Sequence, residues 1–213
     1  MKPQHWPLYG LRLRTPRLEL RLPDLELLDH LASVAADGVH APGEMPFTVP
    51  WTAVPPEERG RAVFQHVLST VADWSVQDWA LSLAVLYEGR VVGRQDLTAK
   101  NFAVTGQVTT GSWLGLAHQG RGIGTEMRAA ALHLAFDGLG ARTAVSSAMT
   151  DNPRSLGVSR RLGYLPNGIE VAAVRGAPVT LQRLWMDRAR WEECRSVEVT
   201  VEGLDHCREE FGA

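Results

Sequence analysis

The feature that most constrains this chain is a run of glycines placed where an extended segment turns into a helix, within residues 112–137. β-prone side chains, Trp113 and Leu114 among them, lead into this run, and three glycines follow at alternate positions. Apolar side chains then recur at the three-and-four spacing of one buried helix face: Ile123, Met127, Ala130, Ala131 and Leu134. A strand, a glycine turn and a helix are therefore predicted in direct succession.

Bare glycines at the start of a helix favour the binding of an anion. The first N–H groups of a helix lack an intrahelical partner, and the peptide dipoles add about half a positive charge there. Glycine leaves these amides open to a phosphate. A P-loop would need a lysine after Gly124, where Thr125-Glu126 stand, and a dinucleotide fingerprint would need a glycine in place of Thr125. The pattern predicts a pyrophosphate cradle of another kind, with a ligand-free glycine turn as the alternative.

Length and composition indicate one globular domain, or one domain with an appendage. The chain has 213 residues, of which 45% are hydrophobic and 22% charged, enough to bury a sizeable core. A net charge of −2 gives no electrostatic footprint for nucleic acid or an anionic membrane, so neither partner is expected. Cys194 and Cys207 form no disulfide framework and no metal-binding spacing, which favours the reducing cytoplasm and predicts no metal site. No signal peptide or membrane span is expected either.

Periodicity and capping residues predict alternating strands and helices, with Asp24 and Asn152 as helix N-caps. Strands are expected at residues 11–22, 80–87, 90–99, 107–116, 143–149, 179–186 and 197–201, and helices at residues 24–38, 56–78, 123–137, 153–163 and 187–193. The segment from His40 to Trp51 holds three prolines, a glycine and two aromatic residues. It is too apolar for a solvated connector, so we expect it to fold over another part of the protein.

Three segments carry a resemblance to a known family. Gln119-Gly120-Arg121-Gly122-Ile123-Gly124 resembles the acyl-CoA signature of the GCN5-related N-acetyltransferases (GNAT). Residues 151–164 are similar to the Asn-x-x-Ser…Leu-Gly-Tyr helix of the RimJ/RimL-like branch, and residues 11–23 resemble its opening strand with the Thr-Pro-Arg-Leu core. Residues 40–51 and 196–211 further resemble an actinobacterial subgroup that includes a protein succinyltransferase.

The resemblance implies an α/β fold and a cosubstrate. The expected GNAT fold has a mostly antiparallel mixed sheet, flanked by helices and splayed between its fourth and fifth strands, here residues 107–116 and 143–149. Residues 1–193 would form the acyl-CoA N-acyltransferase domain, with residues 194–213 as an extension carrying an extra strand. Acetyl-CoA or succinyl-CoA would be bound by Leu116, Ala117, Gln119, Gly120, Arg121, Gly122, Ile123, Gly124, Thr125, Asn152 and Ser155.

Direct attack of an amine on a thioester needs a neutral amine and stabilisation of the departing thiolate. By resemblance, Ser155 would donate a proton to that thiolate; a first-turn helix serine facing solvent is the alternative. Among the candidate bases, His40 is preferred because imidazole titrates near neutrality, and a loop histidine that makes a structural hydrogen bond is at least as good an alternative. Glu44 is second. The further candidates are Asp96, His118 and Asp151.

Two functions remain open from the sequence. The first is an enzyme that transfers an acyl group to a primary amine, which would be a protein lysine, a protein N-terminus or a small molecule. The second is a non-catalytic acyl-CoA-binding or interaction module with the same fold, since no base is unambiguous. The alternating strand Val197–Val201 has the pattern of an edge that pairs with another chain, which predicts a homodimer or higher homo-oligomer.

Overall fold

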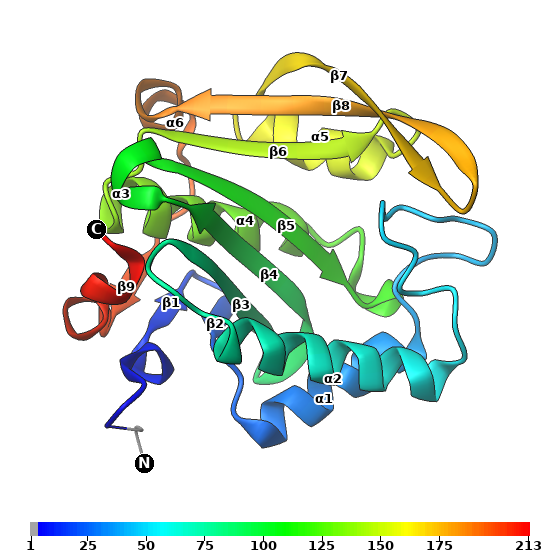
Figure 1. Ribbon diagram of the computed structural model, residues 1–213, viewed down its shortest axis with the longest axis horizontal. Coiled ribbons are helices and arrows are strands. Elements are labelled where there is room, and N and C mark those ends of the chain that lie inside the picture. The colour runs from blue at the N-terminus through cyan, green and yellow to red at the C-terminus, as the bar shows by residue number, and fades with distance from the viewer. Residues whose placement is uncertain (1–3) are drawn as a thin grey trace.

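The computed structural model describes residues 4–213 and places its strands in one mixed sheet (Figure 1). The sheet order is β7-β8-β6-β5-β4-β3-β2-β1-β9, nine strands within the described residues. Every neighbouring pair is antiparallel except β5 and β6, which are parallel. The strands are β1 (Arg12–Arg14), β2 (Leu18–Arg21), β3 (Asp78–Tyr87), β4 (Arg90–Lys100), β5 (Gln107–Leu114), β6 (Thr143–Met149), β7 (Leu165–Val174), β8 (Ala177–Asp187) and β9 (Thr200–Glu202).

Helices cover both faces of this sheet, which confirms the predicted fold class (Figure 1). On one face, α1 (Leu25–Asp37) and α2 (Pro56–Ala72) pack their apolar sides on β3, β4 and the end of β5. On the other face, α4 (Ile123–His133) and α5 (Pro153–Arg161) close the main core. The remaining helical segments are η1 (Pro7–Gly10), α3 (Phe102–Thr105), η2 (Leu116–His118), η3 (Leu134–Gly138), α6 (Arg188–Cys194), η4 (Leu204–His206) and η5 (Arg208–Phe211).

Two helices begin at the predicted caps. The carboxylate of Asp24 accepts a hydrogen bond from the Leu27 amide at 3.0 Å, and Asn152 Oδ1 accepts one from the Ser155 amide at 3.0 Å. Each cap supplies an acceptor to an amide that has no partner inside its helix. The starts of α1 and α5 were therefore readable from local chemistry.

The first predicted strand is in fact a hairpin. Residues 11–22 fold into β1 and β2, which pair antiparallel with Leu13 opposite Leu20. The chain reverses at Thr15-Pro16-Arg17, where Thr15 Oγ1 accepts from the Leu18 amide at 3.0 Å and the Leu18 carbonyl accepts from the Thr15 amide. Alternation of leucine with charged residues is the same on both arms, so periodicity alone did not reveal the turn. The predicted helix 56–78 also ends earlier, at Ala72.

The parallel pair β5 and β6 diverges along its length. Backbone pairing is confined to Gln107–Thr109 on β5 and Thr143–Val145 on β6, whereas the two strands continue to Leu114 and Met149. These are the strands expected to splay, and the divergence is confirmed. Their separated ends point towards the turn that holds the glycines.

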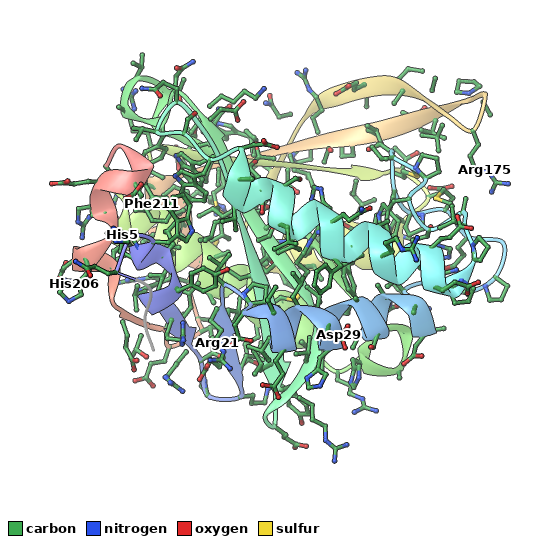
Figure 2. All side chains as sticks on the ribbon, turned by 60° about the horizontal axis from the view of Figure 1, so that its bottom comes forward. His5, Arg21, Asp29, Arg175, His206 and Phe211 are labelled. Atoms are coloured by element: carbon green, nitrogen blue, oxygen red, sulfur yellow. The ribbon has the colours of Figure 1, made fainter. Side chains whose placement is uncertain are left out.

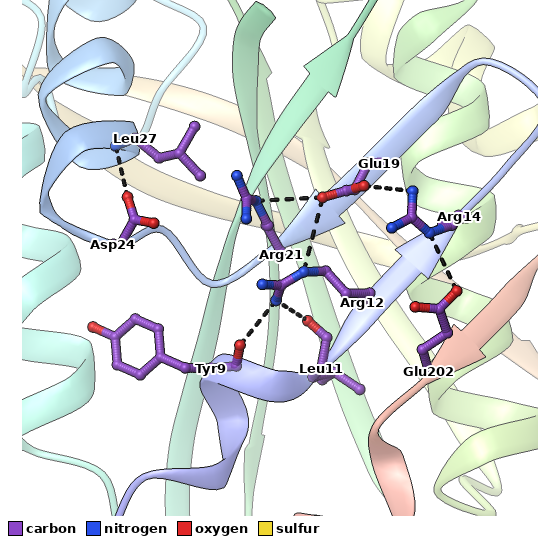
Figure 3. A network of polar contacts seen from close by, with 9 residues as sticks. All are labelled: Tyr9, Leu11, Arg12, Arg14, Glu19, Arg21, Asp24, Leu27 and Glu202. Atoms are coloured by element: carbon purple, nitrogen blue, oxygen red, sulfur yellow. Dashed lines mark hydrogen bonds and ion pairs between the residues drawn. The ribbon is translucent and has the colours of Figure 1, made fainter. Parts of the chain in front are cut away.

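The C-terminal residues belong to the same fold. Strand β9 pairs antiparallel with β1, and Arg14 of β1 forms ion pairs with Glu19 and with Glu202 of β9 (Figure 3). Phe211 is fully buried, and its carbonyl accepts from Trp79 Nε1 at 3.1 Å (Figure 2). The expected strand 197–201 is thus displaced to Thr200–Glu202, and one of its edges pairs within this chain rather than with another.

Candidate active site

The glycine turn has a backbone shape that requires glycine. Gly120 and Gly122 have φ of +77° and +78°, in the left-handed region that side chains disfavour. Gly122 is the N-cap of α4, and its carbonyl accepts from the amides of Thr125 and Glu126. Among residues 4–213, no acceptor is found for the amides of Gly120, Arg121, Gly122, Ile123 or Gly124. We call these free amides at a helix start the cradle; that they bind a pyrophosphate stays a prediction.

Gln119 ties this cradle to its surroundings. Its Nε2 donates to the carbonyls of Val39 at 2.8 Å and Leu114 at 3.0 Å, and its Oε1 accepts from Arg154 Nη1 at 3.1 Å. One side chain thereby joins the end of β5, the segment after α1 and the start of α5. The pyrophosphate contact that the family resemblance implies for Gln119 stays a prediction, while its side-chain amide makes these three protein contacts.

A pair of residues missed by the sequence analysis borders the cradle. Glu126, in the first turn of α4, is 7% exposed and accepts from Thr15 Oγ1 at 2.6 Å and from Arg17 Nε at 2.7 Å. Arg17 also donates to the Arg121 carbonyl at 3.1 Å. The sequence contains two signals for this pair. An acidic residue beside an anion site needs a cation to neutralise it, and Thr15 and Arg17 belong to the Thr-Pro-Arg-Leu pattern.

Helix α5 presents Asn152 and Ser155 beside the divergent strands. The Oδ1 of Asn152 is used by the N-cap, which leaves its Nδ2 for another acceptor. Ser155 is half-buried, and within the described residues its Oγ makes no hydrogen bond. Both roles considered for Asn152 are thus compatible, because one end of the amide caps the helix and the other remains open.

A buried cation lies behind this helix. Arg128 of α4 is 5% exposed and donates to Ser159 Oγ at 2.9 Å and to Ser112 Oγ at 3.0 Å. Ser159 in turn donates to the Ser155 carbonyl at 3.1 Å. Burial lowers the pKa of Arg128, but a guanidinium remains charged in proteins. The positive charge therefore sits between β5 and α5, and no carboxylate in the described part of the chain pairs with it.

His40 is held by both of its ring nitrogens. Nδ1 lies 2.9 Å from the Ala41 carbonyl and Nε2 lies 2.8 Å from Thr52 Oγ1. Because a carbonyl oxygen only accepts, Nδ1 carries the proton in the neutral ring and Nε2 accepts from the Thr52 hydroxyl. A substrate proton can reach Nε2 only by displacing Thr52. This arrangement favours the structural alternative for His40, and its role as a base stays a prediction.

The loop around His40 bridges the gap between the divergent strands. Aromatic rings run from Phe47 to Trp51 at 5.1 Å between centroids, and from Trp51 to Trp113 of β5 at 5.7 Å. On the other side, Met45 packs on the cluster that contains Met149 of β6. Figure 1 shows this loop at the end of β5, beside the tip of the β7–β8 hairpin. The expectation that the loop folds over another part of the protein is confirmed.

Acidic and basic groups meet on the sheet face beneath α2. Asp96 of β4 pairs with Arg94 at 2.9 Å through Oδ2, while its buried Oδ1 has no partner among residues 4–213. Gly111 of β5 lies opposite Asp96 in the sheet register. The pKa of His66 on α2 is lowered, first by burial and then by Arg94, with Asp96 opposing. His66 is a further residue that the sequence analysis missed.

The other predicted bases lie apart from this cluster. Glu44 and Asp151 are exposed, and His118 lies in η2 with its Nδ1 buried. Leu116 and Ala117 are exposed in the same short segment, between β5 and the glycine turn. The described residues contain no group of three or more His, Cys, Asp or Glu side chains arranged to hold a metal ion. None of the helices in residues 4–213 is long and apolar enough to cross a membrane.

Comparison with known proteins identifies related sequences and folds. A family model described as the acetyltransferase (GNAT) domain matches residues 17–165. Mycobacterium smegmatis RimJ, solved in complex with CoA-disulfide, is 16% identical with a TM-score of 0.68, and the match covers 94% of each chain. A GCN5-related N-acetyltransferase from Brucella melitensis is 21% identical with a TM-score of 0.63, covering 100% of this chain and 88% of that one.

A third structure extends the same comparison. RimL, the ribosomal L7/L12 alpha-N-protein acetyltransferase in complex with coenzyme A, is 20% identical with a TM-score of 0.63. The match covers 81% of this chain and 95% of that chain. At these identities the structures establish the shared fold, and the match of the family model establishes descent.

Proposed function

Since the chain belongs to the acetyltransferase (GNAT) domain family, we propose that it transfers an acetyl group from acetyl-CoA to a primary amine. The observation that carries this proposal is the set of free amides from Gly120 to Gly124, placed where β5 and β6 diverge. A pyrophosphate binds at such a helix start, and the divergence leaves unpaired β5 backbone for the amide groups of a pantetheine arm. The backbone shape that exposes these amides needs glycine, since a side chain at either left-handed position would strain the turn.

The residues around this path have complementary roles. Next to the cradle, Ala117 offers backbone groups without a backbone partner among residues 4–213, whereas the amide of Leu116 donates to the Gly38 carbonyl and its carbonyl accepts from the Gln119 amide. The free Nδ2 of Asn152 offers a donor to a pantetheine carbonyl. Ser155, one turn further on, is the group we propose to protonate the thiolate that leaves. Buried Arg128 favours negative charge at this place through its field.

The amine must lose a proton as its nitrogen bonds to the acyl carbon and the carbon–sulfur bond breaks. We propose Asp96 as the first acceptor to test, because its Oδ1 is buried, without a protein partner in the described residues, and opposite Gly111. The neighbouring His66 is the second. His40 can accept the proton only if the Thr52 hydroxyl moves away from its Nε2. The exposed Glu44 is the last candidate.

Acceptor and acyl donor are proposed at different levels of detail. RimL acts on the α-amino group of a ribosomal protein, so a protein N-terminus is the first acceptor to test, followed by lysine and small amines. Succinyl-CoA is the second donor, on the basis of the resemblance of residues 40–51 and 196–211 to the actinobacterial subgroup. The free thiols of Cys194 and Cys207 fit a reducing compartment such as the cytoplasm.

The direct test measures release of free CoA from acetyl-CoA and from succinyl-CoA, in the presence of N-terminal peptides, lysine peptides and small amines. Ser155→Ala is expected to lower kcat about 100-fold, the range of a lost general acid, with little change in binding of CoA. Asn152→Ala is expected to raise KM for the donor. Ser33→Ala, which removes an exposed hydroxyl bonded only to its own helix, is the matched control.

The alternative is a CoA-binding module without turnover, favoured by the locked ring of His40. It predicts calorimetric binding of CoA with no acyl transfer to any amine in the panel. Absence of CoA binding at millimolar concentration would refute both functions. We also propose that the outer edge of β9 or β7 supports a homo-oligomer, and light scattering that reports a monomer would refute this.

A further inference from the structure

Arg17 and Glu126 form a clamp between the β1–β2 turn and the first turn of α4. Both oxygens of the carboxylate are occupied: Oε1 accepts from Thr15 Oγ1 at 2.6 Å and from the Arg17 amide at 3.1 Å. Oε2 accepts from Arg17 Nε at 2.7 Å and lies 2.6 Å from Arg17 Nη2. Such a two-pronged guanidinium–carboxylate contact is among the strongest polar contacts in proteins.

The same guanidinium also reaches the glycine turn. Its Nη1 donates to the Arg121 carbonyl at 3.1 Å, and a Cβ built on Gly122 would lie 3.4 Å from its Nη2. The group sits 6.0 Å from the centre of the Tyr87 ring, which supports it from β3. One side chain therefore holds a peptide of the cradle and borders the glycine whose φ shapes it.

The location of Glu126 poses an electrostatic problem for the cradle. A carboxylate in the first turn of a helix is favoured by the helix dipole, which is the same property that draws in a pyrophosphate. A bare, buried negative charge one turn from the cradle would repel that ligand, and the repulsion is poorly screened away from water. Arg17 cancels this charge, since its fork is directed at the carboxylate.

We propose, on the basis of the proposed function, that Arg17 is a positioning residue for the acyl-CoA site. It neutralises Glu126 and pins the Arg121 carbonyl, so that the amides from Gly122 to Gly124 meet the pyrophosphate without a competing charge. The Thr-Pro-Arg-Leu segment is thereby part of the cosubstrate site, although it lies more than a hundred positions away in the sequence.

The test measures the calorimetric Kd of coenzyme A together with kcat and KM for acetyl-CoA. Arg17→Ala is expected to weaken CoA binding about tenfold and to raise KM by a similar factor, with kcat changed less than about twofold. The double variant Arg17→Ala/Glu126→Gln is expected to return to within about threefold of the wild-type Kd, because the repelling charge is gone. A purely structural clamp would show no such rescue.

Two further variants keep the test decisive. Arg17→Lys retains the charge without the fork and is expected to bind CoA more tightly than Arg17→Ala. If the alanine variant does not fold, the lysine variant replaces it in the comparison with wild type. Arg14→Ala removes an arginine of the same hairpin whose partners are Glu19 and Glu202, away from the glycines, and is expected to leave the Kd unchanged (Figure 3).

The results that would overturn the role of Arg17 differ from the result that would refute the proposed function. A Kd for Arg17→Ala within twofold of wild type, or a double variant as weak as the single one, would overturn the role of Arg17. Wild-type protein that does not bind CoA would refute the proposed function instead.

Discussion

Replacement of Gly122 by alanine should show how the shape of the cradle affects CoA binding, separately from its effect on the stability of the fold. Gly122 has φ of +78°, and a left-handed conformation costs a residue with a Cβ about 1–2 kcal/mol. For a chain of this size each kcal/mol lowers Tm by about 2–4 °C, so a fall of about 2–8 °C is expected. If alanine relaxes the strain by rotating the turn, an amide leaves the cradle. Loss of one charge-assisted hydrogen bond would weaken binding of CoA roughly 10- to 100-fold.

Gly176 provides the matched control for this experiment. It lies in the β7–β8 hairpin turn with φ of +77°, and a Cβ built there meets nothing within 4 Å. It directly follows Arg175, which lies at the opposite end of the molecule from Phe211 (Figure 2). Gly176→Ala should therefore lower Tm by a similar amount and leave the Kd of CoA unchanged.

Differential scanning fluorimetry and titration calorimetry with CoA supply the two measurements. The expected result is two variants of equal stability and unequal affinity. If both variants bind CoA as the wild-type protein does, the turn does not hold the ligand and the reasoning from its amides fails. If both lose affinity equally, the loss reflects stability and the cradle again carries no specific role.

Three other predictions follow from burial. Phe211→Ala empties a fully buried position against Trp79 and should lower the unfolding free energy by about 3–5 kcal/mol in urea denaturation; an unchanged midpoint would mean the last residues are not part of the fold. Burial raises the pKa of Cys207 to about 11, so at neutral pH its thiolate fraction is about 100-fold lower than that of an unperturbed thiol. Because a more basic thiolate is also more nucleophilic, the native thiol should react with a disulfide reagent about tenfold more slowly than an unperturbed one, and slower than Cys194; equal rates would contradict this. The pKa of His133 is lowered, chiefly by burial, so the unfolded chain binds more protons near its reference pKa of about 6.5. The contribution of neutral His133 to the free energy of unfolding is complete above that pH and declines as the pH falls. His133→Gln should therefore flatten the pH dependence of the free energy of unfolding between about pH 7 and 5. An unaltered slope of this free energy against pH would refute the assignment.

The order of the elements and the cradle could be read from the sequence because both depend on neighbours along the chain. Asp24 and Asn152 cap helices through amides three residues away, and the glycines act on the helix that directly follows them. The hairpin at Thr15 was missed for the opposite reason. Both arms carry the same alternation, and only pairing between them shows that the chain reverses.

The roles of individual side chains were less predictable. His40 was chosen as a base from its residue type, but the hydroxyl of Thr52, twelve positions on, occupies its Nε2. Asp96 and His66 lie on different elements, and only the packing of α2 over the sheet brings their charges together. The strand near the C-terminus was expected to pair between chains, because the periodicity of a strand does not name its partner.

The sequence by itself therefore determined the local structure of the site: a strand, a left-handed glycine turn and a helix start with free amides that favour an anion. These features follow from backbone sterics and from hydrogen bonds that span a few residues. Tertiary structure decided which charged side chains surround the glycine turn and the helix start. Arg17, Glu126 and Arg128 meet the cradle and α5 through contacts between distant segments, because long-range packing sets the distances on which electrostatic interactions depend.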